Sequence, residues 1–159
     1  HSWLKSLEIN QKNLISTAKS FMGLPYLWGG TSAKGVDCSG FTKTIYFLNG
    51  VLLPRDASQQ VNVGELVDTE NGFDNILPGD LLFFGRKADG DKKERATHVG
   101  MYIGDTEFIH SSGMVKINSL DSSRENFSEY RFKSFIRAKR IISSLDKNGV
   151  KLLSNYLFK

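Results

Sequence analysis

The sequence predicts an α+β domain, with helices first and an antiparallel sheet after them. Three observations support this prediction. The chain has 159 residues, the size of one globular domain, and it contains no internal repeat. Apolar residues recur at helical spacing in the first third of the chain. Short β-rich segments separated by turn signals fill the second half.

Two helices account for much of the first 50 residues. Residues 11–22 place apolar side chains at helical spacing, and a glycine and a proline follow. The second helix is expected to begin at about Cys38, with Asp37 as its N-cap and Gly50 near its C-terminal end. The glycine-rich stretch 28–35 between them suits a close approach of backbone segments.

The rest of the chain is predicted to contain one more short helix, the sheet and a tail. Residues 57–64 form the helix, and the charged stretch from Gly85 to Thr97 forms a mobile hairpin loop. Residues 143–159 form a C-terminal extension that is helical from 151 onward. The strands are expected at residues 81–84, 98–103, 107–110, 115–118 and 135–140.

Composition argues against several classes of function. The net charge is +4, and the basic residues are scattered rather than gathered in one stripe, so nucleic-acid binding is not expected. No apolar run approaches the roughly 20 residues that span a bilayer, and no signal peptide is visible. The single cysteine excludes an internal disulfide and a cysteine-based zinc site. We expect no cofactor and no metal.

The single cysteine, Cys38, is the candidate nucleophile. A lone cysteine is more often an inert buried residue. Cys38, however, is expected at the start of a helix, where free backbone N–H groups favour anions. Such a position lowers the pKa of a thiol and can hold the oxyanion of a tetrahedral intermediate. The small neighbours Ser39 and Gly40 let a substrate backbone approach. Position alone leaves the inert and the reactive alternatives equally open.

Two histidines supply a candidate base and a residue to orient it. His98 begins a predicted strand and His110 ends the next one, around a turn near Gly104. A three-residue loop would put both rings on one face at neighbouring positions, whereas a two-residue loop would separate them unless a bulge intervenes. On one face, His98 can take the thiol proton while His110 orients its ring. The alternatives are half-buried strand histidines, or a metal pair without an evident third ligand.

The remaining candidate residues surround the cysteine in the sequence. Tyr26 and Trp28 either line a cleft or pack in the core, and the Tyr26 hydroxyl is a candidate oxyanion donor. Asp37 either caps its helix or binds a substrate ammonium group. Arg55 and Asp56 form a second charged site, or else a surface ion pair with little energetic effect.

Six motifs together resemble the NlpC family of bacterial cell-wall cysteine peptidases. They occur in the order of the family and cover roughly residues 11–140. One such motif alone is weak evidence, but six in order are highly specific. The motifs are PYLWGG at 25–30, DCSGF at 37–41, LPRDASQQ at 53–60, LPGDL at 77–81, HVGMYI at 98–103 and FIHSS at 108–112.

The resemblance implies a papain-like fold, in which the helix of the nucleophile packs on an antiparallel sheet that carries the base and the orienter. Carried over by position, Cys38 is the nucleophile, His98 the base, His110 the orienter and Tyr26 a donor to the oxyanion. It also implies hydrolysis of peptidoglycan stem peptides, commonly between γ-D-glutamate and a diamino acid, through a thioacyl intermediate.

Substrate binding and context follow from the same resemblance. In members that require a free N-terminal L-alanine, the positions of Asp37 and Asp56 bind its ammonium group. Such members have upstream bacterial Src-homology-3-like domains that complete the site. Residues 1–142 correspond to the catalytic domain, and the initial His1 suggests a processed product or a fragment. The expected partners are peptidoglycan or murein peptides. The expected location is the periplasm, the cell surface or the medium, or the cytoplasm for a recycling enzyme.

Two other functions fit the same residues. An acyltransferase or amidase would use the same triad on another acyl donor, and added amine nucleophiles would reveal it. A catalytically inactive wall-binding module would keep the fold but have an unreactive Cys38 thiol.

Overall fold

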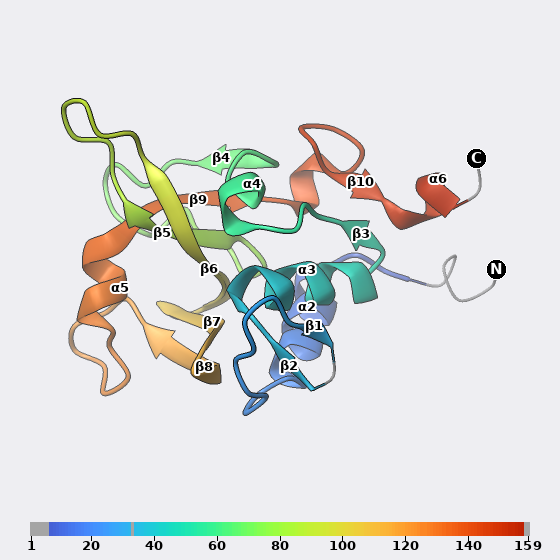
Figure 1. Ribbon diagram of the computed structural model, residues 1–159, viewed down its shortest axis with the longest axis horizontal. Coiled ribbons are helices and arrows are strands. Elements are labelled where there is room, and N and C mark those ends of the chain that lie inside the picture. Colours follow the sequence, from blue (N-terminus) through green and yellow to red (C-terminus); the bar gives the residue numbers. More distant parts are fainter. Residues whose placement is uncertain (1–6, 33, 158–159) are drawn as a thin grey trace.

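The computed structural model describes residues 7–32 and 34–157, and its centre is a six-stranded antiparallel sheet with the strand order β4-β9-β5-β6-β7-β8 (Figure 1). The sheet strands are β4 (Glu65–Val67), β5 (Leu81–Arg86), β6 (Arg95–Gly104), β7 (Glu107–Ser112), β8 (Met114–Ser119) and β9 (Phe135–Arg140). The helices are α2 (Gln11–Lys19), α3 (Cys38–Leu48), α4 (Ala57–Gln60), α5 (Glu129–Ser134) and α6 (Leu153–Leu157), with a 3-10 turn η1 at Ile142–Ser144. Within the described ranges, no helix is long and apolar enough to cross a membrane.

Among residues 7–32 and 34–157, four short strands lie outside the main sheet. The ribbon of β1 (Thr31–Ser32) and β2 (Gly35–Val36) lies just before α3, where the glycine-rich stretch was expected to let backbone segments approach closely. The second pair joins β3 (Val51–Leu52) to β10 (Lys151–Leu152). This pairing attaches the C-terminal segment to the end of α3.

The two N-terminal helices begin at the predicted residues, although the C-cap of α3 is Asn49 rather than Gly50. Asn10 caps α2, where its side-chain oxygen accepts a hydrogen bond from Asn13 N at 2.8 Å. The helix ends at Lys19 rather than at 22, because the chain turns there and Gly23 N bonds to Val115 O at 2.9 Å. The predicted Asp37 cap of α3 is confirmed, since its carboxylate accepts from Gly40 N at 2.6 Å.

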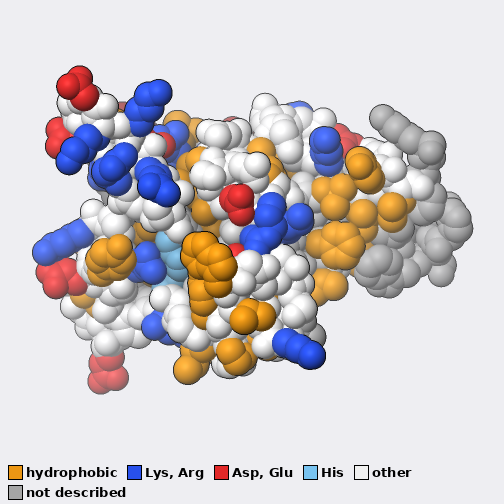
Figure 2. Space-filling view, in the orientation of Figure 1, with side chains coloured by type: hydrophobic (Ala, Val, Ile, Leu, Met, Phe, Trp, Pro, Cys, Tyr) orange, Lys and Arg blue, Asp and Glu red, His pale blue; other side chains and the backbone are white. Residues whose placement is uncertain are grey.

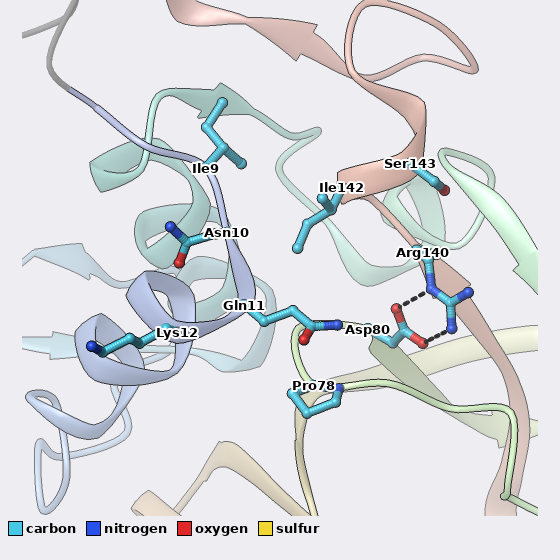
Figure 3. A pocket seen from close by; sticks show the side chains of 9 residues that line it. All are labelled: Ile9, Asn10, Gln11, Lys12, Pro78, Asp80, Arg140, Ile142 and Ser143. Carbon is cyan, nitrogen blue, oxygen red and sulfur yellow. Dashed lines mark hydrogen bonds and ion pairs between the residues drawn. The ribbon is translucent and has the colours of Figure 1, made fainter.

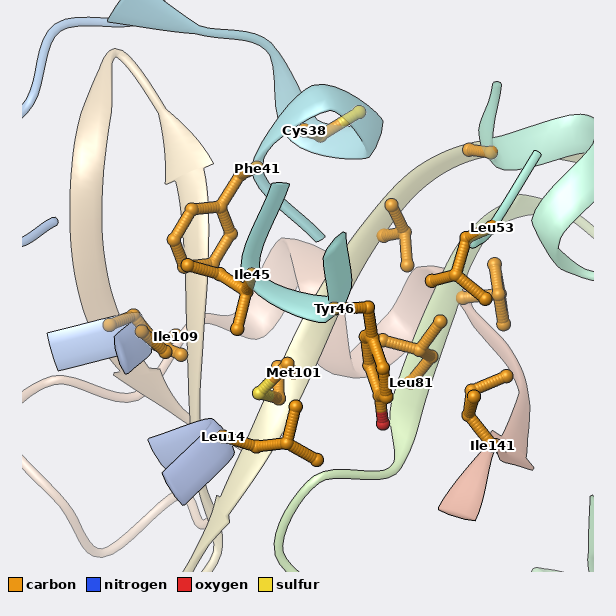
Figure 4. Packing of buried hydrophobic residues seen from close by; sticks show 14 of the residues in the cluster. Leu14, Cys38, Phe41, Ile45, Tyr46, Leu53, Leu81, Met101, Ile109 and Ile141 are labelled. Carbon is orange, nitrogen blue, oxygen red and sulfur yellow. The ribbon is translucent and has the colours of Figure 1, made fainter. Parts of the chain in front are cut away.

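The sheet separates two apolar clusters. Alternate strand residues point to opposite faces, so Leu81 and Phe83 join the helices while Leu82 and Phe84 face the other way. On the helical face, the α3 side chains Phe41, Ile45 and Tyr46 pack among Leu14, Leu81, Met101 and Ile109 (Figure 4). Each fully buried side chain of this size stabilises the fold by about 1.5–3 kcal/mol. This packing fixes α3, and with it Cys38, on the sheet.

The hairpin between β5 and β6 differs from the prediction. The strands extend well into the expected 85–97 loop, so the connection spans only residues 87–94 and His98 is the fourth residue of β6 rather than the first. A bulge follows Phe84. Gly85 has a φ of 152°, and a Cβ there would lie 2.1 Å from the Arg95 carbonyl oxygen. Only glycine allows that close approach.

The two other helical predictions are wrong in extent. The 57–64 helix ends at Gln60, and Gly64 N instead bonds to Asn148 O at 2.9 Å. The expected C-terminal helix begins at Leu153, because residues 151–152 pair with β3. Residues 158–159 lie outside the described part of the chain. The division of the chain at residue 142 stays a prediction.

Candidate active site

Cys38 is the first residue of α3 and lies against β6. Its side chain is almost buried, and its Sγ lies 4.0 Å from the carbonyl oxygen of Thr97, the residue before His98. Figure 4 shows the thiol on the first turn of α3, with its sulfur directed away from Phe41 and Ile45. The sequence therefore predicted the position of the candidate nucleophile correctly.

The two histidines meet because of an irregularity in the β6–β7 hairpin. The loop has two residues, Asp105 and Thr106, both with positive φ, and the register shifts between Tyr102 and Gly104. This is the two-residue loop with a bulge, the second of the two arrangements considered from the sequence. His98 Nε2 lies 2.7 Å from His110 Nδ1, and both rings are buried.

A glycine provides the space for this contact. The register Met101–Ile109 continues to place Gly100 opposite His110. A Cβ on Gly100 would lie 3.1 Å from His110 Cβ and 3.1 Å from Phe108 Cδ2. The motif at 98–103 contained this glycine, but the sequence did not show that it faces the second histidine.

A further residue bonded to the histidine pair was missed. Asn118, on β8, brings its Oδ1 to 2.8 Å from His110 Nε2. His110 pairs with Lys116 across the strands, so Asn118 is its diagonal neighbour on the same face. The alternation along β8 was the available signal, but an asparagine there was not distinguishable from a solvent-facing one.

Burial keeps the rings of His98 and His110 uncharged in the absence of substrate. Burial lowers the pKa of His98 well below 6.5, and the nearby charges of Arg131, His110 and Lys116 lower it further. Burial also lowers the pKa of His110 to about 4, although the hydrogen bond with Asn118 opposes the change. At neutral pH both rings are therefore uncharged.

The expectation of a lowered thiol pKa at Cys38 is wrong. Burial raises this pKa above 9.0, and the negative charge of Asp37 raises it too, while hydrogen bonds from the Val99 and Ser39 backbone lower it. The helix N-terminus does not prevail, because the Asp37 carboxylate already occupies the Gly40 N–H. At neutral pH the Cys38 side chain is therefore a thiol, and the His98 and His110 rings are uncharged.

This protonation state predicts the pH dependence of Cys38 alkylation. Only the thiolate reacts, and the folded thiol has a raised pKa, so the rate constant with iodoacetamide should still rise with pH above 9. Alkylation reactions quenched at set times and measured by intact-protein mass spectrometry give this pH profile. Glutathione, whose thiol is exposed to solvent, serves as the control. A rate that is already constant at pH 6 would contradict the prediction.

The candidate site opens into a cavity of about 690 Å³ next to Cys38. Tyr26 and Trp28 line it, which is the first of the two alternatives considered from the sequence, and Trp28 is 88% exposed rather than packed in the core. Burial raises the pKa of Tyr26, and the neighbouring Cys38 and Asp37 raise it further, so its hydroxyl stays protonated and can donate. Figure 2 shows the surface here, with a narrow area of histidine visible between hydrophobic and basic side chains.

Asp37 and Arg55 form one unit at the wall of this cavity. Arg55 donates to both Asp37 oxygens, at 3.1 and 2.7 Å, and Gly29 N donates to Asp37 Oδ2 at 3.1 Å. Arg55 also donates to the Ser39 hydroxyl at 3.0 Å, so the Ser39 side chain points toward the Arg55–Asp37 ion pair. The Asp37 side chain is only 13% exposed. Through these hydrogen bonds, Asp37 links the glycine-rich loop, the first turn of α3 and the segment that contains Arg55.

Asp56 differs from Asp37 although both carry a carboxylate. Its side chain is 65% exposed at the cavity, and its contact with Arg55 is long, at 3.9 Å. Arg55 is thus held mainly by Asp37 rather than by its neighbour, contrary to the simple Arg55–Asp56 pair considered from the sequence. Within residues 7–32 and 34–157, no three histidine, cysteine or acidic side chains gather as a metal site.

The chain is similar in sequence to several curated bacterial proteins. The chain is 50% identical over 99 residues to a γ-D-glutamyl-L-lysine dipeptidyl-peptidase of Bacillus cereus, and 43% identical over 100 residues to one of Bacillus subtilis. These matches cover 62% and 63% of the chain but only 28% and 31% of the relatives, so the chain spans less than a third of their length. It is also 38% identical to the probable endopeptidase NlpC of Escherichia coli over 124 residues, 77% of the chain and 73% of that protein.

Solved structures give the same result for the fold. A crystal structure of an NlpC/P60 family protein from Bacillus cereus superposes with a TM-score of 0.72 at 37% identity, over 86% of this chain and 42% of the other. The NlpC/P60 domain of the peptidoglycan hydrolase SagA gives a TM-score of 0.64 at 25% identity, over 83% and 99%. The predicted papain-like α+β class and the predicted peptidase family are confirmed. The family model for NlpC/P60 matches residues 23–137, and the chain belongs to the NlpC/P60 family.

Proposed function

We propose that this chain is the catalytic domain of a cysteine endopeptidase that hydrolyses peptidoglycan stem peptides between γ-D-glutamate and a diamino acid. The observation that carries the proposal is the position of Cys38, at the start of α3 and at the wall of a cavity. It lies beside β6, whose His98 is bonded to His110 of β7. The Bacillus relatives are named γ-D-glutamyl-L-lysine dipeptidyl-peptidases, which supports the choice of bond.

The proposed mechanism begins from the neutral pair. His98 Nε2 is engaged with His110, so Nδ1 is the nitrogen left to accept the thiol proton as Cys38 Sγ attacks the γ-carbonyl carbon. The backbone N–H groups at the start of α3 and the Tyr26 hydroxyl stabilise the oxyanion. The His98 imidazolium then protonates the leaving amine, which gives a thioester. Water, deprotonated by His98, hydrolyses the thioester and releases the free acid.

Substrate binding is proposed to use the two acidic residues differently. The exposed Asp56 carboxylate at the cavity binds the free ammonium group of an N-terminal L-alanine. Asp37 contributes through its ion pair with Arg55, which holds the cavity wall in place. We also propose that the whole protein has further domains, which bind the cell wall or complete the substrate site.

Defined peptides test the proposed reaction. Purified protein should hydrolyse L-Ala-γ-D-Glu-L-Lys with one water to L-Ala-D-Glu and free L-lysine, which mass spectrometry identifies. The matched control is the peptide with α-linked L-glutamate, which should remain intact. An N-acetylated substrate should be cut far more slowly, because Asp56 then has no ammonium to bind. Failure to cut any γ-linked peptide would refute the proposal, and amine adducts formed with added hydroxylamine in place of free acid would favour the acyltransferase alternative.

A further inference from the structure

The hydrogen bonds beyond His110 form a chain with only one possible direction. Asn118 Nδ2 donates to the backbone carbonyl of Asn126 at 2.9 Å. A carbonyl can only accept, so the amide group must present its nitrogen to Asn126 and its oxygen to His110. Asn118 Oδ1 lies 2.8 Å from His110 Nε2. His110 Nε2 must therefore carry a proton.

The backbone fixes the carbonyl at the end of this chain. The same Asn126 oxygen accepts from Ser119 N at 2.9 Å, and Ser128 N donates to Ser119 O at 3.0 Å. The Asn126 side chain is bonded in turn to Glu107 Oε2, at 2.7 Å. The loop after β8 is thus tied to the sheet on both sides of Asn126, and the acceptor cannot turn away from Asn118.

The protonation of His110 determines which nitrogen of His98 carries a proton. A neutral His110 with its proton on Nε2 has a lone pair on Nδ1. His98 Nε2, 2.7 Å away, must then donate, so the proton of neutral His98 lies on Nε2. The lone pair of His98 is left on Nδ1, the nitrogen that the proposed mechanism needs as the base. The low pKa of both rings, which face the cations Arg131 and Lys116, keeps this neutral state populated at physiological pH.

We propose that Asn118 is a positioning residue that sets the tautomer of His98 through His110. Its side chain is hydrogen-bonded to His110 and Asn126 and is not part of the cavity lining. It acts on the reaction by determining which nitrogen of His98 is free. The inference rests on the proposed roles of Cys38 and His98. Without the acceptor at position 118, His110 can carry its own proton on Nδ1 instead of Nε2. His98 can then carry its proton on Nδ1, the nitrogen that should accept the thiol proton, and in that tautomer it cannot act as the base.

Two substitutions of Asn118 distinguish the loss of the oxygen that accepts from His110 from the loss of the other contacts of the side chain. Asn118→Leu and Asn118→Asp both lose the donation to Asn126, but only the leucine lacks an oxygen for His110. We expect Asn118→Leu to lower kcat roughly 10- to 100-fold with KM within about twofold. Asn118→Asp should keep kcat within about fivefold. Its acid limb should move to higher pH, because a carboxylate raises the pKa of His110 and stabilises the adjacent imidazolium.

The matched control lies on the same strand. Ser119 is buried and its hydroxyl lies 2.9 Å from Thr106 Oγ1, away from the histidine pair. Ser119→Ala removes the contacts of the hydroxyl with Thr106 and with Asp121 N, but it keeps the backbone bonds to Asn126 and Ser128. The tautomer is not affected, so kcat and the pH profile should match the wild type. An equal loss of kcat in Ser119→Ala and Asn118→Leu, or in Asn118→Asp and Asn118→Leu, would overturn the proposal.

Nitrogen NMR of the ¹⁵N-histidine-labelled full chain reads the tautomer without substrate. In the wild type and in Asn118→Asp, neutral His98 should carry its proton on Nε2, and in Asn118→Leu a substantial fraction should carry it on Nδ1. An unchanged Nε2–H form in Asn118→Leu would refute the inference. This readout is independent of peptide cleavage, so its failure differs from a failure of the proposed function, which would appear as a wild type that cuts no γ-linked peptide.

Discussion

Replacement of Cys38 by alanine should lower the rate of γ-glutamyl hydrolysis by about 10⁴-fold or more. The proposed mechanism has no second nucleophile, since water attacks only the thioester, and loss of a nucleophile in such a triad removes most of its rate acceleration. Binding should persist, because the Tyr26, Trp28 and Asp56 surfaces of the cavity are unchanged. A steady-state assay of lysine release, with peptide binding measured by calorimetry, separates the two effects.

The single cysteine of the chain gives this experiment an internal control. Iodoacetamide can modify no other thiol, so alkylated wild type should lose activity in proportion to the labelled fraction. The thiol lies at the edge of the core, so Cys38→Ala should unfold within a few degrees of the wild type. A folded Cys38→Ala protein that keeps more than about a thousandth of the activity would exclude Cys38 as the nucleophile.

Replacement of Arg140 by methionine should destabilise the fold by about 3–5 kcal/mol. Arg140 donates two hydrogen bonds to Asp80, at 3.0 and 2.8 Å, and the Asp80 side chain is only 3% exposed (Figure 3). Burial already raises the pKa of Asp80, and the Arg140 hydrogen bonds oppose that rise. Methionine fills similar space but leaves the carboxylate buried without its cation. Asp80 also accepts from Leu77 N at 2.8 Å, so the turn before β5 should loosen with it.

Chemical denaturation with guanidinium measures this change, because the midpoint should fall while the slope stays the same. The control is Arg124→Met. Arg124 also pairs with an aspartate, Asp105, but that side chain is 82% exposed. Solvent screens an exposed pair, so this variant should be indistinguishable from the wild type. Equal midpoints for the two variants would show that burial of Asp80 does not determine the strength of its pair.

Local sequence patterns were sufficient for the main elements. Helical spacing placed α2 and α3, and the β-rich segments matched the strands from β5 to β9. Asp37 was identified as the cap of α3, because capping depends on a residue and its immediate neighbours. The helix α5 was missed, and so were β4 and the β3–β10 pair, because strands of two or three residues form only where a partner is supplied from far away in the chain.

The sequence by itself determined the candidate nucleophile, the two histidines and the family, because these depend on residue types and their order. Only the tertiary structure decided how they act together. The β6–β7 bulge sets whether His98 and His110 share a face, and no local pattern encodes a register shift. Burial raises the pKa of Cys38 against the helix effect. The proposed direction of hydrogen-bond donation, from His98 to His110, from His110 to Asn118 and from Asn118 to Asn126, depends on a carbonyl that the loop after β8 places. Desolvation and hydrogen-bond direction both arise from packing between segments, and packing exists only in the folded chain.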